Sequence, residues 1–275
     1  MGLRINTNIP SLQTQRNVSL ATEETTKSYA RLSSGQRITT AGDDAAGLAI
    51  SQNLDATIRG MRQAQRNAND GISLVQTAEG GINEVSNILV RMRELGVQAA
   101  SDTVGDTERG FINKEYESMK SEINRIAHVT NFNGTNLLSG EGKSLTFQVG
   151  TNDGEHNRIE FDPSRTDIRT ETLGVDSVSL LSKENAGESL AKLDAAISKV
   201  NENRADLGAT QNRLHSTSNS LGITHENLSE ARSRIADTDV AQESSNLIKH
   251  NILQSAGISV LAQANSAPQS ALKLL

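Results

Sequence analysis

Apolar residues recur at every seventh position through a long stretch of the C-terminal half. The positions are Leu193, Val200, Leu207, Leu214, Leu221, Leu228 and Ile235. A heptad repeat keeps one stripe of a helix turned toward a partner helix, as in coiled coils. The pattern therefore predicts a single helix over residues 193–235, which would be ~65 Å long at the usual rise per residue.

The stripe on this predicted helix is narrow. From Val200 to Leu228, the residue four positions after each member of the repeat is polar: Arg204, Gln211, Ser218, His225 and Arg232. Burying each aliphatic side chain contributes about 1.5–3 kcal/mol, whereas ordering each backbone residue costs about 1–2 kcal/mol. The helix should not be stable alone, so it requires partner helices.

The N-terminal half contains a second long stripe. It comprises Leu54, Ile58, Met61, Gln65, Ala68, Ile72, Val75, Ile82, Val85, Leu89 and Met92. Asp43 and Asp44 precede the stripe as candidate N-caps, and no proline interrupts it. A third helix is predicted over about residues 107–126. These helices would pack against the heptad helix.

A change to period-two alternation marks a small β excursion between the helices. Residues 145–149 and 158–161 alternate and flank Asn152-Asp153-Gly154, which predicts a β-hairpin. All four phenylalanines fall within residues 111–161, so an aromatic-packed region is expected there. The fold class is mainly α: a long antiparallel helical bundle or coiled coil with one β-hairpin.

Composition excludes several classes of protein. Of the 275 residues 2% are aromatic, there is no cysteine, and the net charge is −6 without any basic stripe. A nucleic-acid partner, a disulfide framework and thiolate metal sites are therefore not expected. The opening residues MGLRINTNIPSL lack the pattern of a secretory signal. Polar residues interrupt the uncharged residues 251–272, so membrane insertion is not expected.

No constellation of residues points to catalysis. Gly142-Lys143-Ser144 lacks the earlier glycine of a phosphate-binding loop and enters a strand. The five histidines show no metal-ligand spacing. We therefore expect no enzyme activity, no catalytic residue, no cofactor and no metal.

Apolar residues at both ends of the chain have no local partner. They are Leu3, Ile5, Ile9 and Leu12 at the start, and Leu247, Ile248, Ile252, Leu253, Ile258, Val260 and Leu261 at the end. Exposed apolar ends indicate a partner surface. On the N-terminal stripe, Leu95 points roughly 100° away from the core-facing residues and lies one turn from Arg91. This geometry predicts an outward contact patch.

Seven segments spread along the chain match those of a known family. They are RLSSGQRITTAGDDAAGLAI (31–50), QAQRNANDGISLVQTAEGGINEV (63–85), VRMRELGVQAA (90–100), Phe132-Asn133-Gly134, QVGTNDGE (148–155), RIADTDVAQES (234–244) and ILQSAGISVLAQAN (252–265). Through them the chain resembles bacterial flagellin along nearly its whole length. Thr39-Thr40 and Gly96 depart from the usual family residues. Few residues separate Gly140 from the returning helix, so the outer variable domains of long flagellins are missing.

The resemblance implies a domain organisation. Residues 1–43 with 236–275 would form a terminal coiled-coil domain that lines the inner tube of a filament. Residues 44–140 with 186–235 would form a core bundle, with the hairpin and loop of residues 141–185 packed on it.

The resemblance also implies partners and a location. The partners would be other copies in a helical homopolymer, an export chaperone, the filament cap and the hook-junction proteins. The subunit would reach the flagellum outside the cell without a cleaved signal peptide. Arg91, Leu95 and Glu115 match flagellin positions that contact neighbouring subunits and the Toll-like flagellin receptor.

A filament subunit for motility is therefore the leading interpretation. A hook–filament junction protein shares the terminal pattern, although the complete VRMRELGVQ segment argues against it. A soluble coiled-coil binding module is a third hypothesis, which would not need apolar termini. In the filament interpretation, residues 1 to about 37 and about 240 to 275 would be disordered in the monomer and would order on assembly.

Overall fold

The computed structural model describes residues 7–272, and they divide into two compact units. Of the described residues, 7–56 with 226–272 form one unit and 57–225 form the other. Both boundaries fall inside long helices, α2 (Ala45–Ala99) and α5 (Lys183–Ala236). Residues 141–185, the hairpin and loop expected to pack on the core bundle, belong to the second unit.

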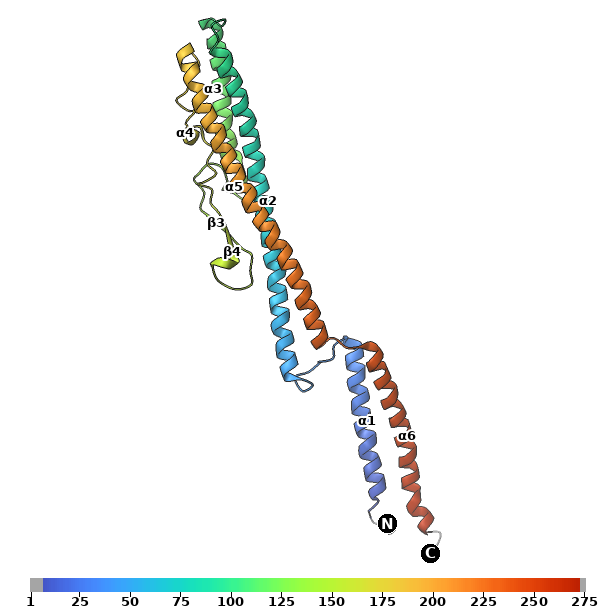
Figure 1. Cartoon of the computed structure of the whole chain (residues 1–275). Helices are drawn as coiled ribbons and strands as arrows, with labels where there is room; N and C mark the ends of the chain where they lie inside the picture. The colour runs from blue at the N-terminus through green and yellow to red at the C-terminus, as the bar shows by residue number, and fades with distance from the viewer. Residues whose placement is uncertain (1–6, 273–275) are drawn as a thin grey trace. The chain divides into compact units, whose positions relative to one another are not determined.

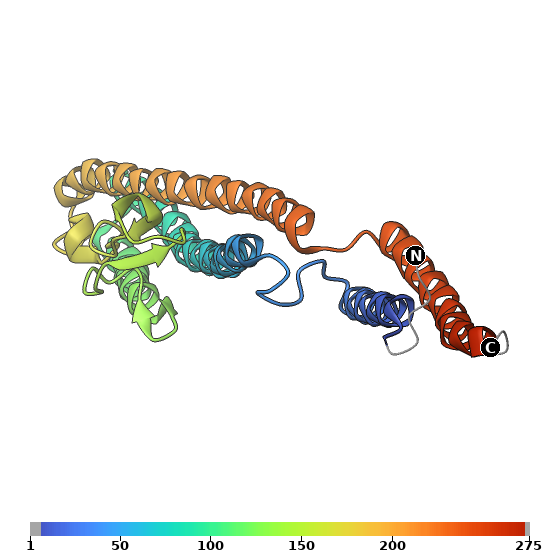
Figure 2. The same ribbon diagram turned by 90° about the horizontal axis from the view of Figure 1, so that it is seen from below.

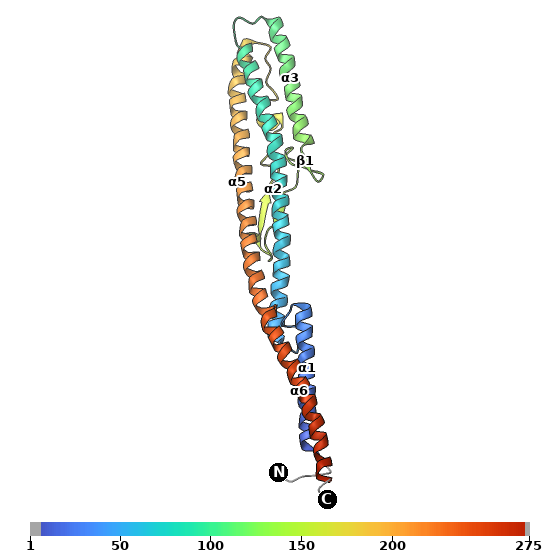
Figure 3. The same cartoon turned by 90° about the vertical axis from the view of Figure 1, so that its right-hand side faces the viewer.

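Three helices form the frame of the second unit. Helix α5 is seen unbroken in Figure 2, α2 is likewise a single helix, and α3 (Asp106–Val129) lies along α2 (Figure 3). Arg93 of α2 forms an ion pair with Asp194 of α5 at 2.6 Å. The guanidinium of Arg109, on α3, donates to the carbonyl of Ala99. The long N-terminal helix, the heptad helix and their pairing are confirmed.

The core of this unit follows the two predicted stripes. Val75, Ile82, Val85, Leu89 and Met92 of α2 are fully buried. The first four members of the heptad repeat, Leu193, Val200, Leu207 and Leu214, are buried in the same cluster. The fifth, Leu221, is only half-buried. The heptad stripe therefore packs tightly over its N-terminal part and loosely over the rest.

Two small antiparallel sheets lie between α3 and α5. Strands β1 (Asn131–Phe132) and β2 (Thr135–Asn136) form one, and β3 (Leu145–Gln148) and β4 (Arg158–Phe161) form the other. In the second sheet Leu145 pairs with Phe161 and Gln148 with Arg158, which confirms the predicted hairpin. Its connection includes a 3₁₀ turn, η1 (Glu155–Asn157).

The expected aromatic packing is only partly correct. Phe161 and Tyr116 are buried, and Phe132 and Phe147 pack against the core. Phe111 is 65% exposed, so its assignment to the packed region is wrong. It lies on the outer face of α3, opposite to the buried Tyr116, because five residues turn a helix by about 140°.

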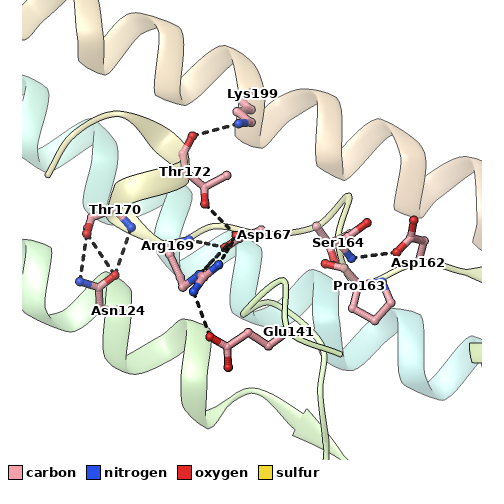
Figure 4. Close-up of polar contacts among 11 residues, drawn as sticks. Asn124, Glu141, Asp162, Pro163, Ser164, Asp167, Arg169, Thr170, Thr172 and Lys199 are labelled. Carbon is pink, nitrogen blue, oxygen red and sulfur yellow. Dashed lines mark hydrogen bonds and ion pairs between the residues drawn. The ribbon is translucent and has the colours of Figure 1, made fainter. Parts of the chain in front are cut away.

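Residues 162–180, called here the crossing segment, connect β4 to α5 and include α4 (Thr170–Leu173). Asp167 anchors the crossing segment, as Figure 4 shows. Its carboxylate accepts hydrogen bonds from the Arg169 guanidinium at 2.9 Å and from the Thr172 hydroxyl at 2.7 Å. Arg169 also pairs with Glu141 at 3.1 Å. Because Ile168, Val175 and Leu180 are buried, the crossing segment contributes to the core.

Asp167→Asn should make the second unit less stable at neutral pH. Burial raises the pKa of the Asp167 carboxyl, but hydrogen bonds from Arg169 and Thr172 outweigh it, and the pKa lies below its ordinary value. A lowered carboxyl pKa stabilises the fold above the unfolded-state pKa of about 4, and this stabilisation is lost as pH falls through the folded-state value. We expect a loss of about 1–3 kcal/mol at pH 7.

Urea unfolding at pH 7 and at successively lower pH measures this effect. The wild type should approach the stability of Asp167→Asn as the pH falls below about 4. Glu171→Gln is the matched control, because Glu171 is exposed on the same segment. An equal loss in both variants, or a constant difference across pH, would contradict the assignment.

Asn203→Leu should stabilise the second unit. Asn203 is 5% exposed on α5, between the buried Val200 and Leu207, and its amide nitrogen has no protein acceptor among the described residues. An unpartnered buried donor costs about 1–3 kcal/mol. Thermal unfolding should show a gain of about 1 kcal/mol or more, whereas the exposed Asn201→Leu should stay within about 0.5 kcal/mol. A destabilised Asn203→Leu would show that the amide has a structural role.

The first unit is built on an antiparallel pair of helices, α1 (Ile9–Ser34) and α6 (Val240–Leu272), which lie side by side (Figure 1). Asn8 caps α1 by accepting from the Ser11 amide, and Gly35 ends it in the left-handed region at φ 69°. Only Gly adopts that conformation without strain, so the helix ends there. The pair supplies the larger of the candidate surfaces.

Candidate self-association surfaces

Helices α1 and α6 contact each other through a seam that is largely polar. The Asn8 amide donates to the carbonyl of Ala264 at 2.8 Å, and the Gln254 amide donates to the Thr22 hydroxyl at 3.0 Å. A side chain at Gly257 would approach Val18 within 2.6 Å, so glycine permits the close contact. The seam therefore fixes the pairing of the helices without burying their large apolar side chains.

Those apolar side chains point outward. The buried residues of α1 are Ala21, Thr25 and Ser28. Large apolar residues of this pair that are about half or more exposed are Ile9, Leu12, Leu20, Val240, Ile248, Ile252, Leu253, Ile258 and Val260. We call this set the terminal apolar surface. Contiguous exposed apolar surface of this kind marks a site of protein association.

Exposed apolar residues project from α6 in several directions. At about 100° per residue, Ile252, Leu253 and Ile258 point in three directions that divide the circle nearly evenly. One groove of about 490 Å³ includes Leu20, Leu253 and Val260, and a second includes Ile248, Ile252 and Ser259. A surface helix normally carries its apolar residues in one stripe that faces the core. Helix α1 covers only one side of α6, so the apolar residues on its other sides indicate further partners.

The predicted terminal contact residues fall into three groups. Ile9, Leu12 and Ile252 are exposed at 47%, 58% and 62%. Leu247 and Leu261 are half-buried. Leu3 and Ile5 lie outside the described residues.

A polar cluster holds the ends of the helices in this unit. Arg31 of α1 pairs with Asp43 at 3.4 Å and lies 4.0 Å from Glu243 of α6. The Asp43 carboxylate accepts from the backbone and side chain of Thr40, and from Thr39, and these hydrogen bonds lower its pKa to about 2. Asp44, not Asp43, caps α2 by accepting from the Gly47 amide at 2.8 Å.

In the second unit, Arg91 and Glu115 form an exposed ion pair. The Arg91 guanidinium lies 3.1 Å from Glu115 of α3 and 2.9 Å from Glu94, and these carboxylates raise the pKa of Arg91. Both side chains of the Arg91–Glu115 pair are about half exposed. The structure therefore brings together two of the three residues of the predicted patch.

Leu95, the third residue, does not belong to the surface. It is 1% exposed and forms part of the main core, so the prediction that it points outward is wrong. The stripe of Val85, Leu89 and Met92 faces α5, but α2 also packs against α3 on an adjacent face. Leu95 is buried on that second face. A helix with two neighbours has a core arc wider than a single stripe.

Phe111 lies one helical turn from Glu115 on α3, because the two are four residues apart. It is 65% exposed. We call Arg91, Glu115 and Phe111 the Arg91 patch. Val90 and Val97 of α2 are also exposed, at 47% and 50%, but they project about 100–120° away from Arg91 around the helix. The sequence signal for the two valines was their spacing of seven residues on a face away from the core stripe.

Two other kinds of site, a metal site and a membrane span, were considered for the described part of the chain. No group of three or more His, Asp and Glu residues within residues 7–272 is arranged to hold a metal ion. Among the same residues, no helix combines the length and the apolar character needed to cross a membrane.

The chain is similar to known proteins along nearly its whole length. Residues 5–143 match the model of the bacterial flagellin N-terminal helical region, and residues 190–275 match that of the C-terminal helical region. A flagellin of Halalkalibacterium halodurans is 42% identical over 98% of this chain and 99% of its own length. The flagellar filament 30.7 kDa core protein of Treponema maltophilum is 38% identical over 98% of this chain and 99% of its own length.

A solved structure shows the same fold. The crystal structure of Bacillus cereus flagellin covers 57% of this chain and 88% of its own chain, with 35% identity and a TM-score of 0.51. The two family models together span most of the sequence, including both helices of the terminal pair and all three helices of the bundle. On this evidence the chain belongs to the bacterial flagellin family.

Proposed function

We propose that this chain is a structural subunit that polymerises into the bacterial flagellar filament and thereby serves motility. The single observation that carries the proposal is the terminal apolar surface, whose large side chains stay about half or more exposed among the described residues. A relative that matches this chain along nearly the whole length of both proteins carries the name of a flagellar filament core protein. The contacts of such a polymer are head-to-tail and do not close, so growth is unlimited.

Electron microscopy of the purified protein tests this function. After salt and short seeds are added, filaments of unlimited length should appear. A hook–filament junction protein would add only a short zone at the end of a seed. A soluble coiled-coil module would remain monomeric or form a closed oligomer. Persistent monomer under all seeding conditions would contradict the proposal.

We further propose that the terminal helices fold together with assembly. Support comes from the small burial of α1 and from the exposure of α6. Ordering some 35–40 residues at each end costs about 1–2 kcal/mol per residue. Lateral neighbours in a filament would supply the missing burial, so folding would be coupled to binding.

The Arg91 patch is proposed as a contact for a neighbouring subunit and for the Toll-like flagellin receptor. An exposed aromatic side chain, Phe111, one turn from the Arg91–Glu115 pair suits a protein interface, where aromatic residues and arginine are enriched. Arg91→Glu should weaken filament growth and receptor binding, whereas the exposed and distant Lys199→Glu should not. Unchanged growth and unchanged receptor binding in Arg91→Glu would remove this role.

The remaining partners follow from the same surfaces. An export chaperone would cover α6 before assembly, and the filament cap and hook-junction proteins would receive the subunit outside the cell. A chain that lacks residues 240–275 should no longer be held by the chaperone. No catalytic role is proposed, because the function rests on packing.

A further inference from the structure

A two-residue turn projects from the second unit between β1 and β2. Asn131 pairs with Asn136 and Phe132 with Thr135, so Asn133 and Gly134 form the apex. Both have positive φ, 48° and 80°, as a type I′ turn requires. This is the one Asn-Gly pair in the sequence.

The apex is open to solvent and loosely held. Asn133 and Gly134 are both exposed, and a Cβ placed on Gly134 would meet no atom within 4 Å. Within residues 7–272 the Asn133 side chain makes no hydrogen bond, whereas the amide of Asn131 donates to the Val129 carbonyl at 2.9 Å. A hairpin with two residue pairs is marginally stable, so its turn opens readily.

We propose that Asn133 is a site of spontaneous deamidation. The backbone nitrogen of Gly134 loses its proton to solvent and attacks Cγ of Asn133. The new N–Cγ bond closes a succinimide ring, the Cγ–Nδ2 bond breaks, and ammonia leaves. Water then adds to either ring carbonyl and opens the ring to aspartate or isoaspartate. Water is the sole co-reactant, and nothing is oxidised or reduced.

The absence of a side chain at residue 134 favours the reaction here. Gly134 has no Cβ to shield its nitrogen, and glycine moves freely between backbone conformations. Asn131 and Asn136 of the same hairpin precede Phe132 and Leu137, whose side chains hinder the attack. The structure thus provides two internal comparisons for the same reaction in one hairpin.

Deamidation changes both charge and backbone at the apex. Either product adds one negative charge. Isoaspartate also inserts a methylene group into the main chain, which does not fit a type I′ turn. The flanking residues Thr130 and Leu138 contact α2 at Gly81, where a Cβ would come within 2.7–2.8 Å of them. The loss of β1–β2 pairing therefore occurs beside a close contact with the bundle.

Incubation of the full-length protein in ¹⁸O water at neutral pH tests the proposal. Digestion at mildly acidic pH with a lysine- and arginine-specific protease releases residues 126–143, which contain all three asparagines. Tandem mass spectrometry should find ¹⁸O-labelled aspartate and isoaspartate at residue 133, with no change at residues 131 and 136. A synthetic peptide of residues 126–143 calibrates the unhindered rate.

Two variants complete the test. Asn133→Gln should remain unlabelled, because its longer side chain forms the ring far more slowly. Gly134→Ala should reduce the ¹⁸O labelling of residue 133 in both the protein and the peptide. Because the peptide has no fold to disturb, the reduction there reports the chemical effect of the alanine side chain alone. The proposal is overturned if residue 133 stays unlabelled in the protein, or if residues 131 and 136 react as fast.

Discussion

Ile252→Asp is expected to abolish polymerisation while leaving the fold of residues 57–225 intact. Ile252 is 62% exposed on α6, so it contributes nothing to the core of a single chain. In a polymer the Ile252→Asp variant would lose about 1.5–3 kcal/mol of apolar burial. The buried carboxylate would add a further cost of several kcal/mol. A loss of about 3 kcal/mol per contact raises the concentration needed for growth by about two orders of magnitude.

Sedimentation of the variant with wild-type seeds measures this loss. Ile252→Leu is the matched control, because it keeps an apolar side chain of equal size and should polymerise like the wild type. Circular dichroism should show the same thermal transition for the second unit in all three proteins. Normal filaments from Ile252→Asp would show that this face of α6 remains exposed to solvent in the polymer, which would contradict the prediction.

Leu95→Ala should destabilise the second unit by about 2–5 kcal/mol. The side chain is 1% exposed, and a leucine truncated to alanine in a packed core loses its burial and leaves a cavity. The substitution should also reduce polymerisation, but only through the lost stability of the subunit.

Val97→Ala separates core from surface two residues further along the same helix. Val97 is 50% exposed, so the change should alter the unfolding free energy by less than about 0.5 kcal/mol. Urea unfolding followed by circular dichroism compares the two variants. Equally small changes in unfolding free energy for both variants would show that the Leu95 side chain is exposed. That result would contradict the packing of α2 against both α3 and α5.

The long helices could be predicted because their patterns are long. The stripe from Leu54 to Met92 and the heptad from Leu193 to Ile235 each extend through many turns, and chance alternation does not persist over that length. Element α2 therefore appears as expected, and α5 contains all seven heptad positions. The hairpin was also predictable, since its period-two strands flank a turn sequence.

The exposed patch on α2 was harder to predict. The period of the apolar residues locates one buried stripe but does not reveal how many helices pack against α2. Leu95 lies about 100° from the stripe axis, which is outward for a helix with one partner and inward for a helix with two. Phe111 shows the converse case, an aromatic residue on an outer face. No local pattern distinguishes these cases without knowing where α3 packs.

The crossing segment was not predictable in detail. Asp167, Arg169, Glu141 and Thr172 are brought together by tertiary packing, and their spacing in the sequence carries no periodic signal. By contrast, the terminal apolar surface was predictable from the sequence. Apolar residues recur at both ends of the chain without a local partner, which indicates a surface that another protein covers.

Limited proteolysis of monomer and filament tests most directly whether the terminal pair is completed by other copies. Cleavable residues lie on both helices: Arg16, Lys27 and Arg31 on α1, and Lys249 on α6. In the monomer these sites should be cut quickly, leaving a resistant core of about residues 44–235, whereas filaments should keep both ends. Equal cleavage of the terminal helices in monomer and filament would contradict the account.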